Sequence, residues 1–318
     1  MGERQMLPVH TVRISTITTS APQRRGRDRH ARAGTVVRVT DEPAAPTPTR
    51  RPSAGSRDGT GSGPGASGRR GARSRPRAEE RPTLGSRTWL EGSRTARRWN
   101  VELLGWVAIG LGVGTIGSIL VGRAVVGLAG VVLADVVLWA GMLAPVVVAF
   151  TRGVPRGLLR IRALDLLWAA GFGLALRAVQ GGLAVAAGDS GALPTFPMIN
   201  GALPDGWLFL SVISPIVVAP VIESLLFHGV IVVAVYRIAR RGLEGALLAI
   251  VCSTAAFVAV HAITVGIADW GQTAALALVG ATCAGLVVLT GRVWTAVGVH
   301  AVYNAAGVAL ALAGTALG

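Results

Sequence analysis

Seven apolar stretches, each about as long as a bilayer is thick, occupy most of the chain beyond residue 100. A helix needs about 20 apolar residues to cross roughly 30 Å of hydrocarbon. Stretches of about that length occur at about 101–122, 125–150, 163–187, 207–238, 246–267, 273–290 and 294–316. In lipid, such stretches satisfy their backbone hydrogen bonds as helices. The sequence therefore predicts an all-α fold, a polytopic integral membrane bundle of about seven transmembrane helices.

The first 98 residues have a different composition. They hold 21 arginines and 8 acidic residues and are rich in Pro, Gly, Ser and Thr, as in GTGSGPGASGRRGARSRPR. So few large apolar side chains cannot form a core that offsets the entropy lost on folding. We therefore predict a disordered Arg/Pro/Gly-rich tail over 1–98 and a transmembrane domain over 99–318. The arginine-rich runs lack interleaved aromatic residues, so nucleic acid is not an expected partner, whereas the apolar spans make the lipid bilayer one.

The distribution of arginine predicts the orientation of the helices. The links at 151–162 and 236–241 carry several arginines, whereas the link at 188–206 carries Asp189 and Asp205 and no basic residue. Because basic loops stay on the cytoplasmic side, we expect the tail and the basic links in the cytoplasm and the 188–206 link outside. The chain has no lysine and abundant Ala, Gly and Val. That composition is typical of a high-GC genome and favours a bacterial origin and the cell membrane as location.

The stretch at 207–241 is too long for one plain span, since it would extend for roughly 52 Å as an α-helix. Pro215 and Pro220 each lack an N–H and clash with the preceding turn, so we expect a bend or break at one of them. A helix that restarts at Pro220 would place Glu223 in its first turn, where the peptide dipoles favour a carboxylate.

Strongly polar side chains inside apolar spans are costly in lipid, so each is a functional or pairing candidate. Asp135 and Arg177 lie in different spans and are expected to bind each other across helices. The free cysteines, Cys252 and Cys283, lie in apolar segments with no metal or disulfide spacing and are expected to serve packing.

Four other polar residues form an ordered pattern on three spans. They are Glu223 in APVIESLLFHG (219–229), His261 in FVAVH (257–261), and His300 and Asn304 in HAVYN (300–304). Residues four apart share one face of a helix, which also places Phe257 beside His261. Counting about 1.5 Å per residue from the basic links puts Glu223, His261 and His300 at depths of roughly 21, 24 and 12 Å. Straight spans would therefore not bring the three together, so tilt, a break near Pro220 or a different span boundary must close the gap.

A carboxylate and two imidazoles in one cavity suffice for peptide hydrolysis without a serine or cysteine nucleophile. The carboxylate and a histidine can deprotonate water and pass the proton to the leaving amine, while the second histidine and the amide donate to the oxyanion. Equally, Glu223, His261 and His300 could hold Zn²⁺ with water as fourth ligand. The residues alone leave both a zinc site and a site without cofactor open.

The three segments, in this order, resemble the motifs of the CAAX protease and bacteriocin-processing (CPBP, or Abi) family of intramembrane proteases. Its members typically carry Pro-x-x-Glu-Glu-Leu-Leu-Phe-Arg-Gly, then Phe-x-x-x-His, then His-x-x-x-Asn on successive helices. The likeness covers about 205–310. It implies that Glu223 and His261 activate a water and that His300 and Asn304 stabilise the oxyanion. It also implies a hydrolase whose substrate is a peptide or a membrane-anchored protein.

Two positions depart from that pattern. The Leu-Leu-Phe-x-Gly register aligns Glu223 with the first glutamate and puts Ser224 at the second glutamate and His228 at the arginine. A hydroxyl supplies no negative charge, and a histidine supplies a titratable cation in place of a permanent one. Beside an intramembrane endopeptidase, two functions stay open: a catalytically impaired CPBP-like immunity or scaffold protein, and a proton-coupled transporter that uses the same residues as a relay.

Overall fold

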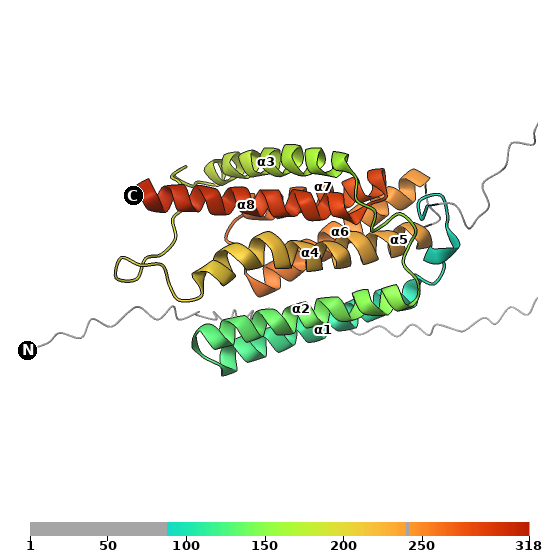
Figure 1. Ribbon diagram of the computed structural model, residues 1–318, viewed down its shortest axis with the longest axis horizontal. Coiled ribbons are helices and arrows are strands. Elements are labelled where there is room, and N and C mark those ends of the chain that lie inside the picture. The colour runs from blue at the N-terminus through green and yellow to red at the C-terminus, as the bar shows by residue number, and fades with distance from the viewer. Residues whose placement is uncertain (1–87, 240–241, 318) are drawn as a thin grey trace, which may run out of the picture. The chain divides into compact units, whose positions relative to one another are not determined.

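The computed structural model describes residues 88–239 and 242–317, and Figure 1 shows how their helices are arranged. The elements are η1 (Arg94–Ala96), α1 (Val101–Ala124), α2 (Gly127–Thr151), α3 (Ala163–Ala186), η2 (Leu208–Val218), α4 (Ala219–Glu223), η3 (Ser224–Ile231), α5 (Val232–Ile238), α6 (Gly242–Thr264), α7 (Trp270–Thr290) and α8 (Val293–Leu317). Seven helical segments are long and apolar enough to cross a membrane, and η2 to α5 together form one of them, 31 residues long. The predicted all-α membrane bundle is confirmed.

The segment from η2 to α5 runs through the middle of the bundle. The pair α1 and α2 packs along one side of it, and α3 and α8 lie side by side on the other (Figure 1). Of the apolar part of this central segment, 61% is buried inside the protein, against 11% to 39% for the other six spans. The polar motif at 219–229 therefore lies in the protein interior, shielded from lipid by neighbouring helices.

The central segment does not break at either proline, so the expected restart of a helix at Pro220 is wrong. Its backbone is helical from Leu208 to Ile238, but η2 and η3 are π-helical, with wider turns closed by bonds between residues i and i+5. Although α4 begins beside Pro220, the preceding Val218 is itself in the right-handed helical conformation. Pro215 lies in the wider turns of η2 and Pro220 in α4, both within one continuous helix, and Glu223 ends α4 instead of opening a new helix.

Residues 88–98, the end of the predicted tail, pack against the helices, whereas residues 1–87 lie outside the described residues. Trp89 is buried, and its indole N–H donates to the carbonyl of Gly291 at 2.8 Å. Trp99 is fully buried and donates to the carbonyls of Ala149 and Gly153 at 3.0 and 3.1 Å. Large apolar side chains therefore extend the ordered part of the chain ahead of α1.

A two-pronged ion pair joins α3 to the start of α8. Arg292 donates from Nη2 and Nε to Asp165 Oδ1 at 2.6 and 2.9 Å, and both side chains are buried. Next to it, the backbone N–H of Val293 donates to the carbonyl of Leu158 at 2.9 Å. The first turn of α8 therefore lies inside the protein, held against α3.

The predicted ion pair between Asp135 and Arg177 is not formed. Asp135 lies on α2, which packs along α1, whereas Arg177 lies on α3, on the other side of the central segment (Figure 1). Arg177 instead donates from Nε to the carbonyl of Tyr303 on α8 at 3.2 Å. Because α3 and α8 are neighbours, the guanidinium finds its partners there.

Candidate active site

Glu223 lies where α4, α6 and α8 meet. It is the last residue of α4 and is 8% exposed. Its Oε2 is 3.8 Å from Nε2 of His261 and 3.9 Å from Nε2 of His300. The fold therefore brings together the carboxylate and both imidazoles of the three motifs. The structure thus closes the gap that a count along straight spans left between the three side chains.

The carboxylate of Glu223 has an unused acceptor atom. Its Oε2 is buried and has no hydrogen-bond partner among the described residues. The two imidazole nitrogens lie beyond the usual range of 2.7–3.2 Å for a direct hydrogen bond, yet one water could bond to the carboxylate and to an imidazole at once. Leaving a buried polar atom unpaired costs about 1–3 kcal/mol, so such atoms in a native interior call for a role.

The proton of His261 can be assigned from its backbone contact. Its Nδ1 is 2.9 Å from the carbonyl oxygen of Phe257, and a carbonyl only accepts, so Nδ1 carries the hydrogen. In the neutral ring Nε2 then has a lone pair, and it faces Oε2 of Glu223. Two facing acceptors need a donor between them, and a water with its two hydrogens can serve both.

Phe257 holds both histidines in place. Its ring is almost completely buried and lies 4.3 Å from the ring of His261 and 5.7 Å, edge to face, from the ring of His300, centroid to centroid. His300 is buried, and its Nδ1 has no hydrogen-bond partner in the part of the chain that the structure describes. One ring nitrogen of His300 therefore faces Glu223, and the other is unused.

Asn304 contacts the central helix through its side-chain amide. Its Nδ2 donates to the carbonyl of Pro215 at 2.7 Å. In η2 the N–H of Ala219 bonds to the carbonyl of Ser214, so the next donor in that register would be Pro220, which has no N–H. Pro220 thereby leaves the Pro215 carbonyl free to accept from Asn304. The missing N–H of Pro220 thus removes one competitor of Asn304 for this carbonyl, which can accept two hydrogen bonds.

Asn304 lies one turn beyond His300 on α8, and no contact joins its side chain to Glu223 among the described residues. An amide nitrogen carries two hydrogens. The Pro215 carbonyl takes one of them and fixes the orientation of the group, and the second is free for another acceptor.

The two positions that depart from the family motif, Ser224 and His228, are both fully buried in η3. His228 Nδ1 lies 3.1 Å from Ser253 Oγ, and that hydroxyl donates to the carbonyl of Phe227 at 2.9 Å. Since Ser253 has one hydrogen, His228 donates from Nδ1, which leaves Nε2 as an acceptor. Neither that Nε2 nor Ser224 Oγ has a partner within the described range. His228 is therefore held inside the protein by Ser253, in place of the arginine of the family motif.

Ser253 is the site residue that the sequence does not single out. It lies on α6, two helical turns ahead of His261, and is fully buried. A serine in an apolar helix often bonds to its own backbone, so its presence gives no signal by itself. Only the fold brings it beside His228.

Nowhere in residues 88–239 and 242–317 are three or more His, Cys, Asp or Glu side chains arranged to hold a metal ion. Glu223, His261 and His300, the three residues that the sequence suggests as Zn²⁺ ligands, are likewise not arranged in this way. We therefore derive the chemistry of the site from the carboxylate, the imidazoles and the amide.

The described residues form seven helices of membrane-spanning length, which define a multi-pass membrane protein, and inside the bundle a carboxylate faces two imidazoles. Residues 205–306 match the family model described as "Type II CAAX prenyl endopeptidase Rce1-like". The matched segment contains all four motif residues and agrees with the CPBP family, so the resemblance based on the motifs is confirmed. No curated protein and no solved structure matches the chain.

Proposed function

We propose that the protein is an intramembrane endopeptidase of the CPBP/CAAX-protease type, which hydrolyses a peptide bond in a peptide or a membrane-anchored protein. The observation that carries this proposal is the position of Glu223 Oε2, buried without a partner and 3.8 and 3.9 Å from the Nε2 atoms of His261 and His300. The Rce1-like match over 205–306 supports peptide hydrolysis as the reaction class.

In the first step, a water donates its two hydrogens to Glu223 Oε2 and His261 Nε2. Glu223 takes one proton while the water oxygen forms a bond to the carbonyl carbon of the substrate. The carbonyl double bond opens, and the product is a tetrahedral intermediate with a negatively charged oxygen. Base catalysis of this kind contributes a factor of about 10²–10⁴ to the rate.

In the second step, the intermediate collapses. A ring N–H of His300 and the second amide hydrogen of Asn304 donate to the oxyanion, and the Pro215 carbonyl holds the amide in place. The C–N bond then breaks as Glu223 returns its proton to the leaving nitrogen. The products are a carboxylic acid and an amine, and the carboxylate is regenerated.

The arginine distribution supports a cytoplasmic tail and cytoplasmic basic links, with the 188–206 link on the opposite side of the cell membrane. The composition supports a bacterial source. In this orientation the substrate reaches Glu223 within the bilayer, so a membrane-anchored protein or a peptide that partitions into lipid is the expected substrate class.

The proposal is tested with the full chain in lipid nanodiscs and a library of membrane-proximal peptides, with products identified by mass spectrometry. The control is Glu223→Gln, which keeps the size of the side chain and removes the base. We expect cleavage by the wild-type protein and none by the variant. Peptide binding without turnover in the wild type would identify a scaffold or immunity protein, and Glu223-dependent proton flux in proteoliposomes without cleavage would identify a transporter.

A second measurement decides the cofactor. Because the donors of the site are not arranged to hold a metal ion, we expect the cleavage rate to be the same with and without a strong chelator. One equivalent of zinc in the purified protein, lost together with activity on chelation, would assign the site to Zn²⁺ instead.

A further inference from the structure

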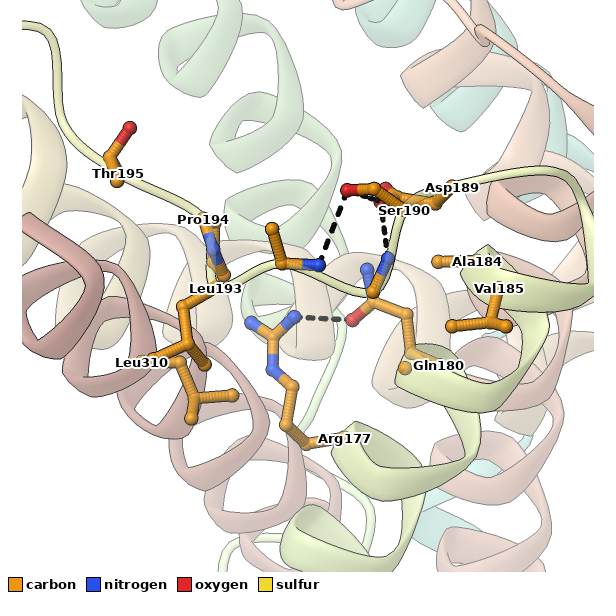
Figure 2. Close-up of a pocket in the computed structure, with 13 residues that line it drawn as sticks. Arg177, Gln180, Ala184, Val185, Asp189, Ser190, Leu193, Pro194, Thr195 and Leu310 are labelled. Carbon is orange, nitrogen blue, oxygen red and sulfur yellow. Dashed lines mark hydrogen bonds between the residues drawn. The ribbon is translucent and has the colours of Figure 1, made fainter. Parts of the chain in front are cut away.

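A second polar region, centred on Arg177, lies between α3 and α8 (Figure 2). The Arg177 side chain donates from Nε to the Tyr303 carbonyl at 3.2 Å and from Nη1 to Gln180 Oε1. Its guanidinium carbon lies 4.5 Å from the centre of the Tyr303 ring. The Tyr303 hydroxyl donates to the same Gln180 oxygen at 2.6 Å. The guanidinium is thus fixed in position entirely by neutral groups.

The positive charge of Arg177 has no counter-charge. Among the described residues no carboxylate lies within ion-pair distance of it, in contrast to Arg292, which Asp165 neutralises. Nη2 also lacks a hydrogen-bond partner in the same part of the chain. An uncompensated cation inside a membrane span is costly and faces a functional cavity as a rule. The guanidinium therefore offers a charge and a free donor group to a ligand.

The packing of α3 against α8 leaves a space that the Arg177 guanidinium fills. Gly307 on α8 lies directly under it, and a Cβ at that residue would overlap Nη2 and Cζ of Arg177. The guanidinium is therefore part of the contact between α3 and α8 and occupies a space that only a glycine at 307 leaves open.

Arg177 lines two pockets. The larger, of about 650 Å³, lies between α3, the 189–195 stretch and Leu310 (Figure 2). The smaller, of about 230 Å³, is lined by Arg177, Pro215 and Asn304. Asn304 is one turn from His300, so the smaller pocket leads from the guanidinium toward the proposed oxyanion donors. Along α8, His300 and Gly307 are about 10 Å apart, a distance that a short extended peptide covers.

We propose that Arg177 binds a carboxylate of the peptide substrate, either its C-terminus or an Asp or Glu side chain, and so positions the peptide against the catalytic residues. This inference rests on the proposed function, because it assigns the carboxylate to the peptide that is cleaved. An arginine donates to a carboxylate through two parallel N–H groups, and such charge-assisted bonds are the stronger kind.

One acidic side chain lines the larger pocket as well. The Oδ1 of Asp189 accepts from the N–H of Gly191 at 3.1 Å and from Ser190 Oγ at 3.4 Å. In Figure 2 these contacts hold the Asp189 carboxylate in the loop, and the Arg177 side chain extends instead toward Gln180. Asp189 therefore provides a control of opposite charge in the same pocket.

The test measures binding by the full chain with Glu223→Gln, so that it does not depend on turnover. Three sets of decapeptides with matched mixed sequences serve as probes: free acids without Asp or Glu, the same sequences as C-terminal amides, and amides with one internal Glu. We expect Arg177→Gln to weaken binding of at least one carboxylate-bearing set by about 10- to 100-fold and to leave the neutral amides unchanged. The two carboxylate sets tell a C-terminus from a side chain.

Two further variants sharpen the result. Arg177→Lys keeps the charge without the fork and is expected to recover part of the affinity, and Asp189→Asn is expected to leave carboxylate binding equal or stronger. The ratio of acid to amide affinity within one preparation is independent of the folded fraction. The inference would be overturned if Arg177→Gln weakened the binding of acids and amides equally or weakened neither. It would also be overturned if the variant lost bound phosphatidylglycerol while its affinity for peptides stayed the same.

The outcomes also separate this inference from the proposed function. Arg177-dependent binding of carboxylates by a protein whose wild-type form cleaves no peptide would support the anion site and contradict the peptidase. If the wild type cleaves peptides but Arg177→Gln binds both acid and amide peptides as tightly as its parent does, the peptidase is supported and the anion site is overturned.

Discussion

Two buried polar clusters lie in the same bundle and satisfy their polar atoms in opposite ways. In the first, Asp165 receives hydrogen bonds from Arg292 at 2.6 and 2.9 Å. In the second, the nitrogens closest to Glu223 Oε2 are 3.8 and 3.9 Å away, and that oxygen has no donor in the described part of the chain. A saturated pair serves the fold, whereas an unsaturated carboxylate keeps its acceptor for a water or a substrate.

The two clusters are connected through α8. Arg292 directly precedes the helix, and His300 lies two turns further along it. The Asp165–Arg292 pair holds the start of α8 against α3, two turns away from His300. The comparison therefore predicts that damage to the first cluster lowers stability, and that damage to the second lowers the rate of cleavage.

After the loss of Glu223 itself, the largest effect is expected for His261→Ala. The variant removes the acceptor that orients the water with Glu223, so the cleavage rate is expected to fall by about 10²–10⁴-fold. Its matched control is Thr264→Ala, which removes a hydroxyl bonded only to the Val260 carbonyl of the same helix. Peptide cleavage assays on both proteins check this, and a His261→Ala rate within threefold of the control would remove His261 from the mechanism.

Asp165→Ala tests the saturated cluster. It leaves the Arg292 charge buried without a partner, so the free energy of unfolding should fall by about 3–5 kcal/mol. The double variant Asp165→Leu, Arg292→Met removes both charges and should lose less. Denaturation of the reconstituted proteins measures both, and equal losses in the single and double variants would show that the charge pair is not what stabilises this contact.

Asn304→Ala is expected to slow cleavage by about 10²-fold, because it removes one oxyanion donor. Pro220→Ala should change the rate in the same direction by a smaller factor, since the new N–H competes with Asn304 for the Pro215 carbonyl. Rates measured at saturating peptide check both changes. A normal rate for Pro220→Ala together with a slow Asn304→Ala would mean that Pro215 does not position the amide.

The smallest effects concern two buried serines. Ser253→Ala leaves His228 Nδ1 and the Phe227 carbonyl without their partner and should cost about 1–3 kcal/mol of stability. Ser224→Ala removes a hydroxyl that has no partner among the described residues, so it should be neutral or slightly stabilising. Unfolding measurements on the two variants check this difference, and a larger loss for Ser224→Ala would show that its hydroxyl is bonded in the folded protein.

The unsaturated cluster could be predicted from the sequence, because its chemistry requires particular residue types at helical spacing. Glu223, His261 and His300 stand out as polar side chains in apolar spans, and the structure brings them together. The mode of their approach could not be predicted, because a uniform rise of about 1.5 Å per residue ignores π-helical turns. The count also treats Arg292 as a surface residue, whereas Arg292 is buried and paired with Asp165, 127 residues away in the sequence.

The partners of Arg177 show the same limit. Two opposite charges in different spans suggest a pair, but whether their helices touch depends on the packing of the whole bundle. The contact of α3 with α8 depends on Gly307, which leaves space for the guanidinium. A glycine in an apolar helix carries no sign of which side chain will occupy that space.

The most direct test asks whether one cluster serves stability and the other cleavage. It determines both the cleavage rate and the free energy of unfolding for the wild type, Glu223→Gln and Asp165→Asn. We predict that Glu223→Gln abolishes cleavage with unchanged or higher stability, since Oε2 has no hydrogen bond to lose among the described residues. Asp165→Asn should lower stability and keep the cleavage rate per folded molecule. Cleavage by Glu223→Gln at the wild-type rate would contradict the central claim that Glu223 activates the water.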